Sequence, residues 1–196
     1  MSRYDERTAL VVVDLQNDFA DPAGGLSVVG GEAIIPIVNA AVREAIDADA
    51  LVVATQDWHP TSTPHFAKDG GIWPVHCVGG TWGAAFHPAF ALPAEAPLVR
   101  KGMNGEDGYS GFTMRDPVSG EEMPTELEAL LRERGIERVV VCGLATDYCV
   151  LATALDAARL GFATSLLTDA VAAVDLSEGD GNRALDRMRE AGVILI

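Results

Sequence analysis

Six short apolar runs recur along the chain, and a stretch with helical periodicity lies between most of them. The runs are rich in Val, Leu and Ile and barely alternate with polar residues, which is typical of parallel strands buried on both faces. The expected strands are Ala9–Val13, Leu51–Ala54, Pro97–Val99, Arg138–Cys142, Ala163–Leu167 and Val193–Ile196. The expected helices are Glu32–Ile46, Thr125–Arg134, Asp147–Leu160 and Glu178–Ala191.

This alternation predicts an α/β fold in which helices cover both faces of a doubly wound, six-stranded parallel sheet, giving three α/β/α layers. Gly135, Gly161 and Gly192 stand where three of the helices are expected to end. No linker or internal repeat interrupts the pattern, so we expect one domain over residues 1–196. The expected strand order across the sheet is 3-2-1-4-5-6.

The segment from Asp57 to Ala96 departs from this pattern. It contains five of the ten prolines, all three tryptophans and all four histidines of the chain. A connection of this length inside a compact domain is usually functional. We therefore expect the segment to contribute to a binding or catalytic site.

The chain of 196 residues carries 29 acidic and 14 basic side chains, for a net charge of −15. This balance repels nucleic acid and anionic membrane surfaces, so neither is an expected partner. The charged N-terminal segment lacks the apolar stretch of a signal peptide, and no run of about 18 apolar residues predicts a membrane span. Three cysteines, an odd and sparse set, indicate free thiols in a reducing compartment, so we expect a cytoplasmic protein.

Asp14 and Cys149 each follow an expected strand, and each has two interpretations. A carboxylate buried after the first strand would need partners or an altered pKa, although a lone Asp there is more often a cap of the following turn. Thr146 is expected to be the N-cap of the helix after the fourth strand. This places Cys149 in the first turn, where the dipole favours a thiolate and free N–H groups could hold an oxyanion. Taken alone, Cys149 is also a plausible core thiol, and Cys142 is expected to be one.

Lys101 stands at the end of the third strand, two residues beyond the apolar run Pro97–Val99. Lysines at strand ends usually reach solvent, but a cation beside a thiolate and a carboxylate would stabilise both. Asp14, Asp57, Lys101 and the Ala145–Cys149 turn each follow a different strand. Because ligands bind at the carboxyl ends of the strands in a doubly wound sheet, we expect these residues to meet there and form an active site.

The long segment also contains a pattern of metal-ligating residues. Three imidazoles and one carboxylate suit a divalent cation, and they belong to Asp57, His59, His65 and His76. Asp57 and His59 are two residues apart, so their side chains face the same way in an extended chain. Cys77 would face away from its neighbour His76, so it is not an expected ligand, and His87 is expected to be structural. Histidines also form hydrogen bonds in loops, which leaves a chance grouping as the alternative.

Three common motifs are absent from the sequence. No G-x-G-x-x-G follows a strand, and neither a Walker A loop nor a G-x-S-x-G elbow occurs. Dinucleotide binding, nucleoside triphosphate binding and serine-elbow chemistry therefore have no support.

Five blocks of sequence carry a resemblance to a known family. They are Val13–Phe19, Asp57–Phe66, Trp73–Cys77, Lys101–Phe112 and Gly143–Val150. Over essentially its whole length, the chain resembles the nicotinamidases and pyrazinamidases of the isochorismatase-like cysteine hydrolase superfamily. The blocks with Asp14, Lys101 and Cys149 are shared by the superfamily, whereas the histidine-rich blocks point to nicotinamidases.

The resemblance implies roles for individual residues. The implied catalytic triad is Asp14, Lys101 and Cys149. A cis peptide bond between Leu144 and Ala145 is implied, which turns the N–H groups of Ala145 and Cys149 toward an oxyanion. The implied ligands of one divalent metal ion are Asp57, His59, His65 and His76, with zinc, manganese, iron and cobalt all open. The implied substrate-binding residues are Phe19, Trp73, Tyr109, Leu144 and Ala145.

The activity that the resemblance implies is hydrolysis of nicotinamide to nicotinate and ammonia in NAD salvage, with pyrazinamide as a further substrate. Glu106, Asp107 and the Asp175–Asp180 segment are less typical of the family, and we expect them at the surface. A homo-oligomer is compatible with the resemblance, and the sequence leaves the oligomeric state open.

Two other functions are compatible with these residues. Another hydrolase of the superfamily, acting on a carbamoyl compound, a different small amide or isochorismate, would share the triad but generally lack the histidine-rich blocks. A non-catalytic, metal-dependent binding protein on the same fold could lose Asp14, Lys101 or Cys149 without penalty, and this chain has all three. The sequence does not rank nicotinamide against pyrazinamide.

Overall fold

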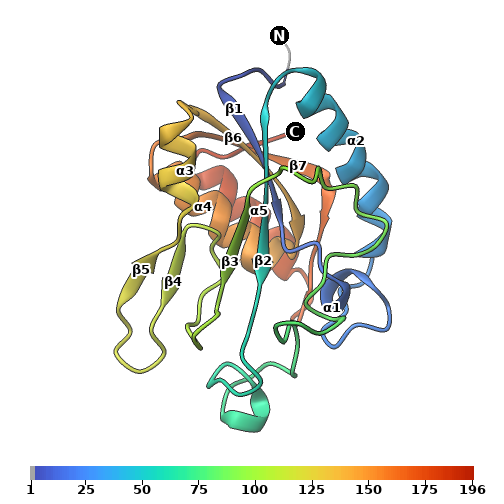
Figure 1. The fold of residues 1–196 in the computed structure, drawn as a ribbon, viewed down its shortest axis with the longest axis vertical. Coiled ribbons are helices and arrows are strands. Elements are labelled where there is room, and N and C mark those ends of the chain that lie inside the picture. Colours follow the sequence, from blue (N-terminus) through green and yellow to red (C-terminus); the bar gives the residue numbers. More distant parts are fainter. Residues whose placement is uncertain (1–2) are drawn as a thin grey trace.

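The computed structural model describes residues 3–196 and has a six-stranded parallel sheet at its centre (Figure 1). In spatial order its strands are β3 (Leu98–Lys101), β2 (Leu51–Asp57), β1 (Thr8–Val13), β6 (Arg138–Leu144), β7 (Ala163–Ala172) and β8 (Ile194–Leu195). Every neighbouring pair in this sheet is parallel. The order confirms the predicted 3-2-1-4-5-6 arrangement.

Each of the predicted helices is present, with bounds shifted by a few residues. They are the 3-10 turn η1 (Glu32–Ile34) with α2 (Ile35–Asp47), α3 (Leu127–Glu133), the π-helical turn η3 (Thr146–Val150) with α4 (Leu151–Arg159), and α5 (Asp180–Glu190). The short helix α1 (Asn17–Ala20) was not predicted. Within residues 3–196, every helix is too short or too polar to cross a lipid bilayer.

Apolar side chains are buried on both faces of the sheet, as the strand patterns predicted. Val12 and Val140 lie in the cluster that includes α2, whereas Val11 and Val141 lie in the cluster formed with α3, α4 and α5. Successive residues of a strand face opposite sides, so each strand contributes to both clusters. A fully buried side chain of this size contributes roughly 1.5–3 kcal/mol, and the two clusters therefore hold the strand ends rigidly in place.

A small antiparallel hairpin, β4 (Thr113–Arg115) with β5 (Glu122–Pro124), forms a separate two-stranded sheet at the lower left of Figure 1. It was not predicted, because its strands have three residues each and lack an apolar alternation. The Asp116 carboxylate accepts hydrogen bonds from the N–H groups of Val118 and Ser119, and these bonds shape the connecting turn.

The long segment between β2 and β3 has little regular structure beyond the 3-10 turn η2 (Ala67–Asp69), and the buried side chain of Gln16 anchors it. The Gln16 Nε2 donates to the carbonyls of Asp57 at 2.7 Å and Ala84 at 2.9 Å, and its Oε1 accepts from the Asp57 N–H at 2.8 Å. One buried amide thereby ties the end of β2 to the far part of the segment.

Candidate active site

Four polar residues from four strand ends meet at the carboxyl edge of the sheet. Asp14 follows β1, Asp57 ends β2, Lys101 ends β3, and Cys149 lies in η3 directly after β6. All four are buried, with exposed fractions of 0, 5, 1 and 6%. The predicted convergence of these residues is therefore confirmed.

Lys101 lies at the centre of this group. Its Nζ is 2.9 Å from Asp14 Oδ2 and 3.5 Å from Cys149 Sγ, and it also donates a hydrogen bond to Asp57 Oδ1. A buried ammonium requires such partners, because burying it alone would be very unfavourable. Burial disfavours the charged form, but Asp14 and Asp57 outweigh burial and hold the pKa of Lys101 well above its usual value.

The Asp14 carboxylate has a second partner that sequence reasoning missed. The Thr55 hydroxyl donates to Asp14 Oδ1 at 2.7 Å and accepts from the Asp14 N–H at 3.2 Å. The carboxylate thus contacts the hydroxyl of Thr55 and the ammonium of Lys101 rather than capping the following turn, so the alternative of a turn cap is wrong. A signal was present in the sequence, since Thr55 is a polar residue in the otherwise apolar first part of β2.

Burial strongly affects the protonation of Cys149 and of the neighbouring Asp14. It raises the pKa of the Cys149 thiol well above its usual value, and the nearby Lys101 cation offsets only part of this rise. Burial also raises the pKa of Asp14, again against the opposing effect of Lys101. Burial therefore opposes the effect that the helix dipole is expected to have on this thiol. Burial thus favours the thiol form of Cys149 over the thiolate.

The turn that presents Cys149 differs in detail from the expectation. Thr146 is the first residue of η3 and Ala145 is its N-cap, without a side-chain capping bond, so the predicted Thr146 cap is wrong. Instead, the Asp147 carboxylate accepts from the N–H groups of Val174 and Asp175 at 2.9 and 2.8 Å, which anchors the turn to the segment after β7. Cys149 does lie in the first turn, and the peptide bond between Leu144 and Ala145 is cis, as predicted.

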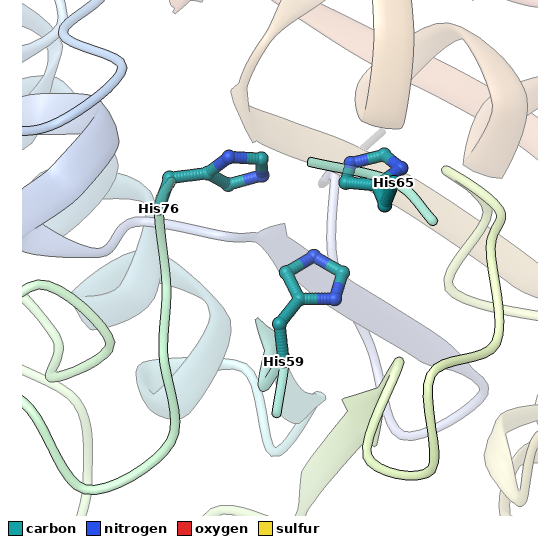
Figure 2. Close-up of side chains that lie close together, drawn as sticks. All are labelled: His59, His65 and His76. Atoms are coloured by element: carbon teal, nitrogen blue, oxygen red, sulfur yellow. The ribbon is translucent and has the colours of Figure 1, made fainter. Parts of the chain in front are cut away.

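Three histidines form a second cluster beside the first (Figure 2). One ring nitrogen from each of His59, His65 and His76 lies within 4.8 Å of the others. The ring centroids are 4.9 Å apart for His59 and His65, 5.2 Å for His59 and His76, and 5.3 Å for His65 and His76. This spacing suits three imidazole ligands around one cation.

The protonation of the rings also suits a metal ion. The Nδ1 of His65 lies 2.9 Å from Asp107 Oδ1 and that of His76 lies 2.7 Å from the Pro74 carbonyl. Since both partners are acceptors, each Nδ1 donates and each Nε2 keeps a free lone pair. Both ring nitrogens of His59 are buried without a hydrogen-bond partner among the described residues. Burial lowers the pKa of His76 to about 4, so its ring is neutral, as a ligand must be.

Asp57 connects the two clusters. Its Oδ1 accepts from Lys101, and its Oδ2 lies 3.8 Å from His59 Nε2. Burial would raise the pKa of this carboxyl, but Lys101 outweighs burial and lowers it, so Asp57 is ionised. The four predicted ligands therefore lie together, and a divalent cation fits the three free imidazole nitrogens and the second oxygen of Asp57.

A small pocket opens onto both clusters. Its lining is Phe19, Leu26, Asp57, His65, Trp73, His76, Tyr109, Ala145, Tyr148, Cys149 and Val174. Leu144, expected in the pocket, is not part of this lining: it is fully buried in the cluster that includes α2, because its place in β6 turns its side chain to that face. Tyr148 was missed, although it precedes Cys149 in the same turn, and neither Leu26 nor Val174 had a sequence signal.

Aromatic side chains from separate segments build the walls of this pocket. The Trp73 Nε1 donates to the Tyr109 hydroxyl at 3.1 Å. Tyr148 packs edge-to-face against both rings, with centroids 4.9 Å from Trp73 and 5.3 Å from Tyr109. Phe19 lies 5.4 Å from the His76 ring. Such a lining suits a flat, apolar ring with few polar groups.

The other two cysteines, His87 and Asp107 can also be compared with the sequence expectations. Cys77 and Cys142 are buried free thiols outside both ligand groups, and His87 lies apart from the histidine cluster, as expected. Asp107, which was expected at the surface, is only partly exposed, because its carboxylate packs against His65. A hydrogen bond across 42 residues of irregular chain has no local sequence signal.

Comparison with known proteins identifies the family. The chain matches the isochorismatase domain over residues 8–196. A nicotinamidase/pyrazinamidase of Mycobacterium tuberculosis is 42% identical over 191 residues, which cover 96% of this chain and 97% of that protein. The structure of a pyrazinamidase of Pyrococcus horikoshii in complex with zinc is 43% identical with a TM-score of 0.86, covering 97% of this chain and 98% of that one.

A third relative shows the same correspondence. The structure of an L. infantum protein in complex with nicotinate is 37% identical with a TM-score of 0.88, and the match covers 98% of this chain and 94% of that one. The sequence match and the structural matches both extend over nearly the whole chain and include the strand ends that carry the site. This chain belongs to the isochorismatase family.

Proposed function

We propose that this protein is a metal-dependent cysteine amidase that hydrolyses nicotinamide to nicotinate and ammonia, and that also accepts pyrazinamide. One observation carries the proposal: Cys149, two of the clustered histidines and an aromatic lining face the same pocket. The relatives support it, since one is a nicotinamidase/pyrazinamidase, one is a pyrazinamidase with zinc, and one binds nicotinate. The free thiols of the described cysteines support a reducing, cytoplasmic location.

The first chemical step is formation of a thioester. Asp14 takes the proton of the Cys149 thiol, and Sγ attacks the carboxamide carbon of the substrate. The raised pKa of Asp14 makes it a stronger base for this neutral thiol. Lys101 stabilises the charge that moves between them, being 2.9 Å from the carboxylate and 3.5 Å from the sulfur.

The N–H groups of Ala145 and Cys149 hold the negative oxygen that forms on the attacked carbon. Asp14 then returns the proton to the amide nitrogen, the C–N bond breaks, and ammonia leaves. A water molecule attacks the thioester while Asp14 accepts its proton. The C–S bond breaks and Cys149 regains its proton from Asp14. The carboxylic acid product loses its remaining proton to solvent and departs as the carboxylate.

Binding of the ring completes the scheme. Phe19 and Trp73 enclose the ring, and Tyr109 and Tyr148 close the side of the pocket. Asp57, His59, His65 and His76 would hold one zinc, manganese, iron or cobalt ion. When bound, this ion supplies a positive centre that positions and polarises the ring nitrogen.

The decisive test measures ammonia release from nicotinamide by protein whose bound metal has been quantified. We expect release that a chelator abolishes, and a loss on the order of 10⁴-fold or more in Cys149→Ala. Cys142→Ala is the matched control, because it removes a buried thiol outside the site. Ammonia release at the parental rate from Cys149→Ala would contradict the scheme.

The main alternative is a related hydrolase acting on a carbamoyl compound or another small amide. The aromatic lining and the three-histidine cluster favour a nitrogen-containing aromatic ring over such substrates. Metal-loaded, reduced protein that leaves nicotinamide and pyrazinamide intact but hydrolyses an N-carbamoyl or aliphatic amide would replace the proposal with this alternative.

A further inference from the structure

Asp107 contacts one of the clustered histidines from outside the ligand group. Its Oδ1 lies 2.9 Å from His65 Nδ1, and among the described residues it is the one carboxylate within hydrogen-bonding distance of any of the three rings. The His65 side chain is 7% exposed, so this contact is shielded from competing water. His76 has a neutral carbonyl partner instead, and His59 has none among the described residues.

The structure holds this carboxylate firmly in place. Its Oδ1 also accepts from the Gly108 N–H at 2.8 Å, and its Oδ2 lies 3.4 Å from Arg115 Nη2. The backbones of Asp107 and Arg115 exchange two hydrogen bonds, at 2.7 and 2.6 Å. Backbone hydrogen bonds therefore hold Asp107 against strand β4, and the carboxylate of Asp107 connects the hairpin to His65.

We propose that Asp107 is a positioning residue for His65. It orients the ring and keeps the ring proton on Nδ1, so that the lone pair of Nε2 is free to face the metal. This inference rests on the metal site of the proposed function. A carboxylate can only accept, so it keeps the proton on Nδ1 and leaves the Nε2 lone pair free. It also raises the basicity of the ring, and partners of this kind typically strengthen metal affinity by 10–100-fold.

The position of His65 makes such support necessary. The residue lies in the irregular segment between β2 and β3, before the short turn η2, and no strand or helix fixes its backbone. Its ring stacks on His59 at 25° between planes, which limits the rotation of the ring without choosing which nitrogen carries the proton. The hydrogen bond that Asp107 accepts determines that the proton lies on Nδ1.

The test measures zinc affinity by chelator competition, with no amide present. We expect Asp107→Asn to bind zinc 10–100-fold more weakly than the parent protein. Glu121→Gln is the matched control, since it removes the same charge from an exposed position in the same hairpin region, and it should bind zinc as the parent does. Thermal unfolding of the metal-free proteins should give the same midpoint for all three.

Two further measurements separate positioning from a structural role. With cobalt in place of zinc, Asp107→Asn should show an altered visible absorption spectrum, whereas Glu121→Gln should match the parent. Equal zinc affinities for Asp107→Asn and Glu121→Gln, or a weakened affinity explained by a lower metal-free midpoint, would overturn the inference. Because zinc binding is read without substrate, failure of the parent to hydrolyse nicotinamide would count against the proposed function alone.

Discussion

Lys101 shows at the scale of one residue why sequence position alone is ambiguous. A lysine at a strand end usually reaches solvent, yet this one is 1% exposed and contacts two carboxylates. The pair Asp14 and Asp57 depends on it, since two buried carboxylates without a cation would repel each other in a medium of low polarity.

Replacing Lys101 with Met tests this dependence. We expect Lys101→Met to lower the free energy of unfolding by about 3–5 kcal/mol, because it leaves buried charges unpaired. Urea denaturation measures the change. Lys68→Met serves as the control, since Lys68 is half-exposed beside Asp69, and a surface pair of this kind contributes at most about 1 kcal/mol. Equal effects of the two substitutions would show that Lys101 is not the buried counter-ion.

The convergence of the candidate catalytic and metal-binding residues could be predicted because each stands beside a recognisable strand or repeats one residue type. Asp14, Lys101 and Cys149 follow apolar runs, and the histidines cluster in one segment. The error at Leu144 concerns the face of the sheet on which its side chain lies, and a shift of one residue reverses that face. The error at Thr146 concerns the residue at which the helical turn begins. The contacts of Thr55 with Asp14 and of Asp107 with His65 were not predicted, because each joins residues more than forty positions apart.

At the scale of elements, the short helix α1 organises loops that are far apart in the chain. The Asp18 carboxylate accepts from the N–H groups of Gly25 at 2.8 Å and Cys77 at 2.6 Å, and Cys77 directly follows His76, a proposed metal ligand. A Cβ on Gly83 would lie 2.0 Å from Asp18 Oδ2, so only a glycine leaves room for this carboxylate.

Removing the Asp18 carboxylate should therefore loosen the site. We expect Asp18→Ala to lower the free energy of unfolding by about 3 kcal/mol, since two charge-assisted hydrogen bonds are lost and two N–H groups lose their partner. Denaturant unfolding compares it with Asp47→Ala, which removes an exposed carboxylate from α2. A midpoint for Asp18→Ala that matches Asp47→Ala would show that Asp18 does not hold these loops.

The elements that could be predicted are those whose patterns are long enough to read. The strands of the main sheet and helices α2 to α5 have runs of apolar or periodic residues, and their order follows from the alternation. The hairpin β4–β5 has three-residue strands with Glu and Pro, and it forms through contacts with residues such as Asp107 rather than through its own propensity.

At the scale of the whole molecule, the apolar clusters enclose ionisable side chains, and the thiol of Cys142 is one of them. Cys142 lies in β6 with no exposed surface, and burial raises the pKa of its thiol from the usual 9.0 to about 12. Above pH 9 the unfolded chain loses this proton while the folded protein keeps it. The folded state then binds more protons than the unfolded state, so stability falls as the pH rises through this window.

The magnitude follows from the shift in the Cys142 pKa. Between about pH 8 and pH 10.5, this thiol should lower the free energy of unfolding by about 2 kcal/mol, and below pH 8 it should have almost no effect. Urea denaturation at several pH values measures the loss in the parent and in Cys142→Ala. The variant has its own packing defect, so the comparison uses the pH dependence of each protein rather than its absolute stability. Parallel pH profiles would show that Cys142 ionises as readily in the folded protein as in the unfolded chain, whereas a shallower profile in the variant would confirm that the sheet core keeps the thiol protonated.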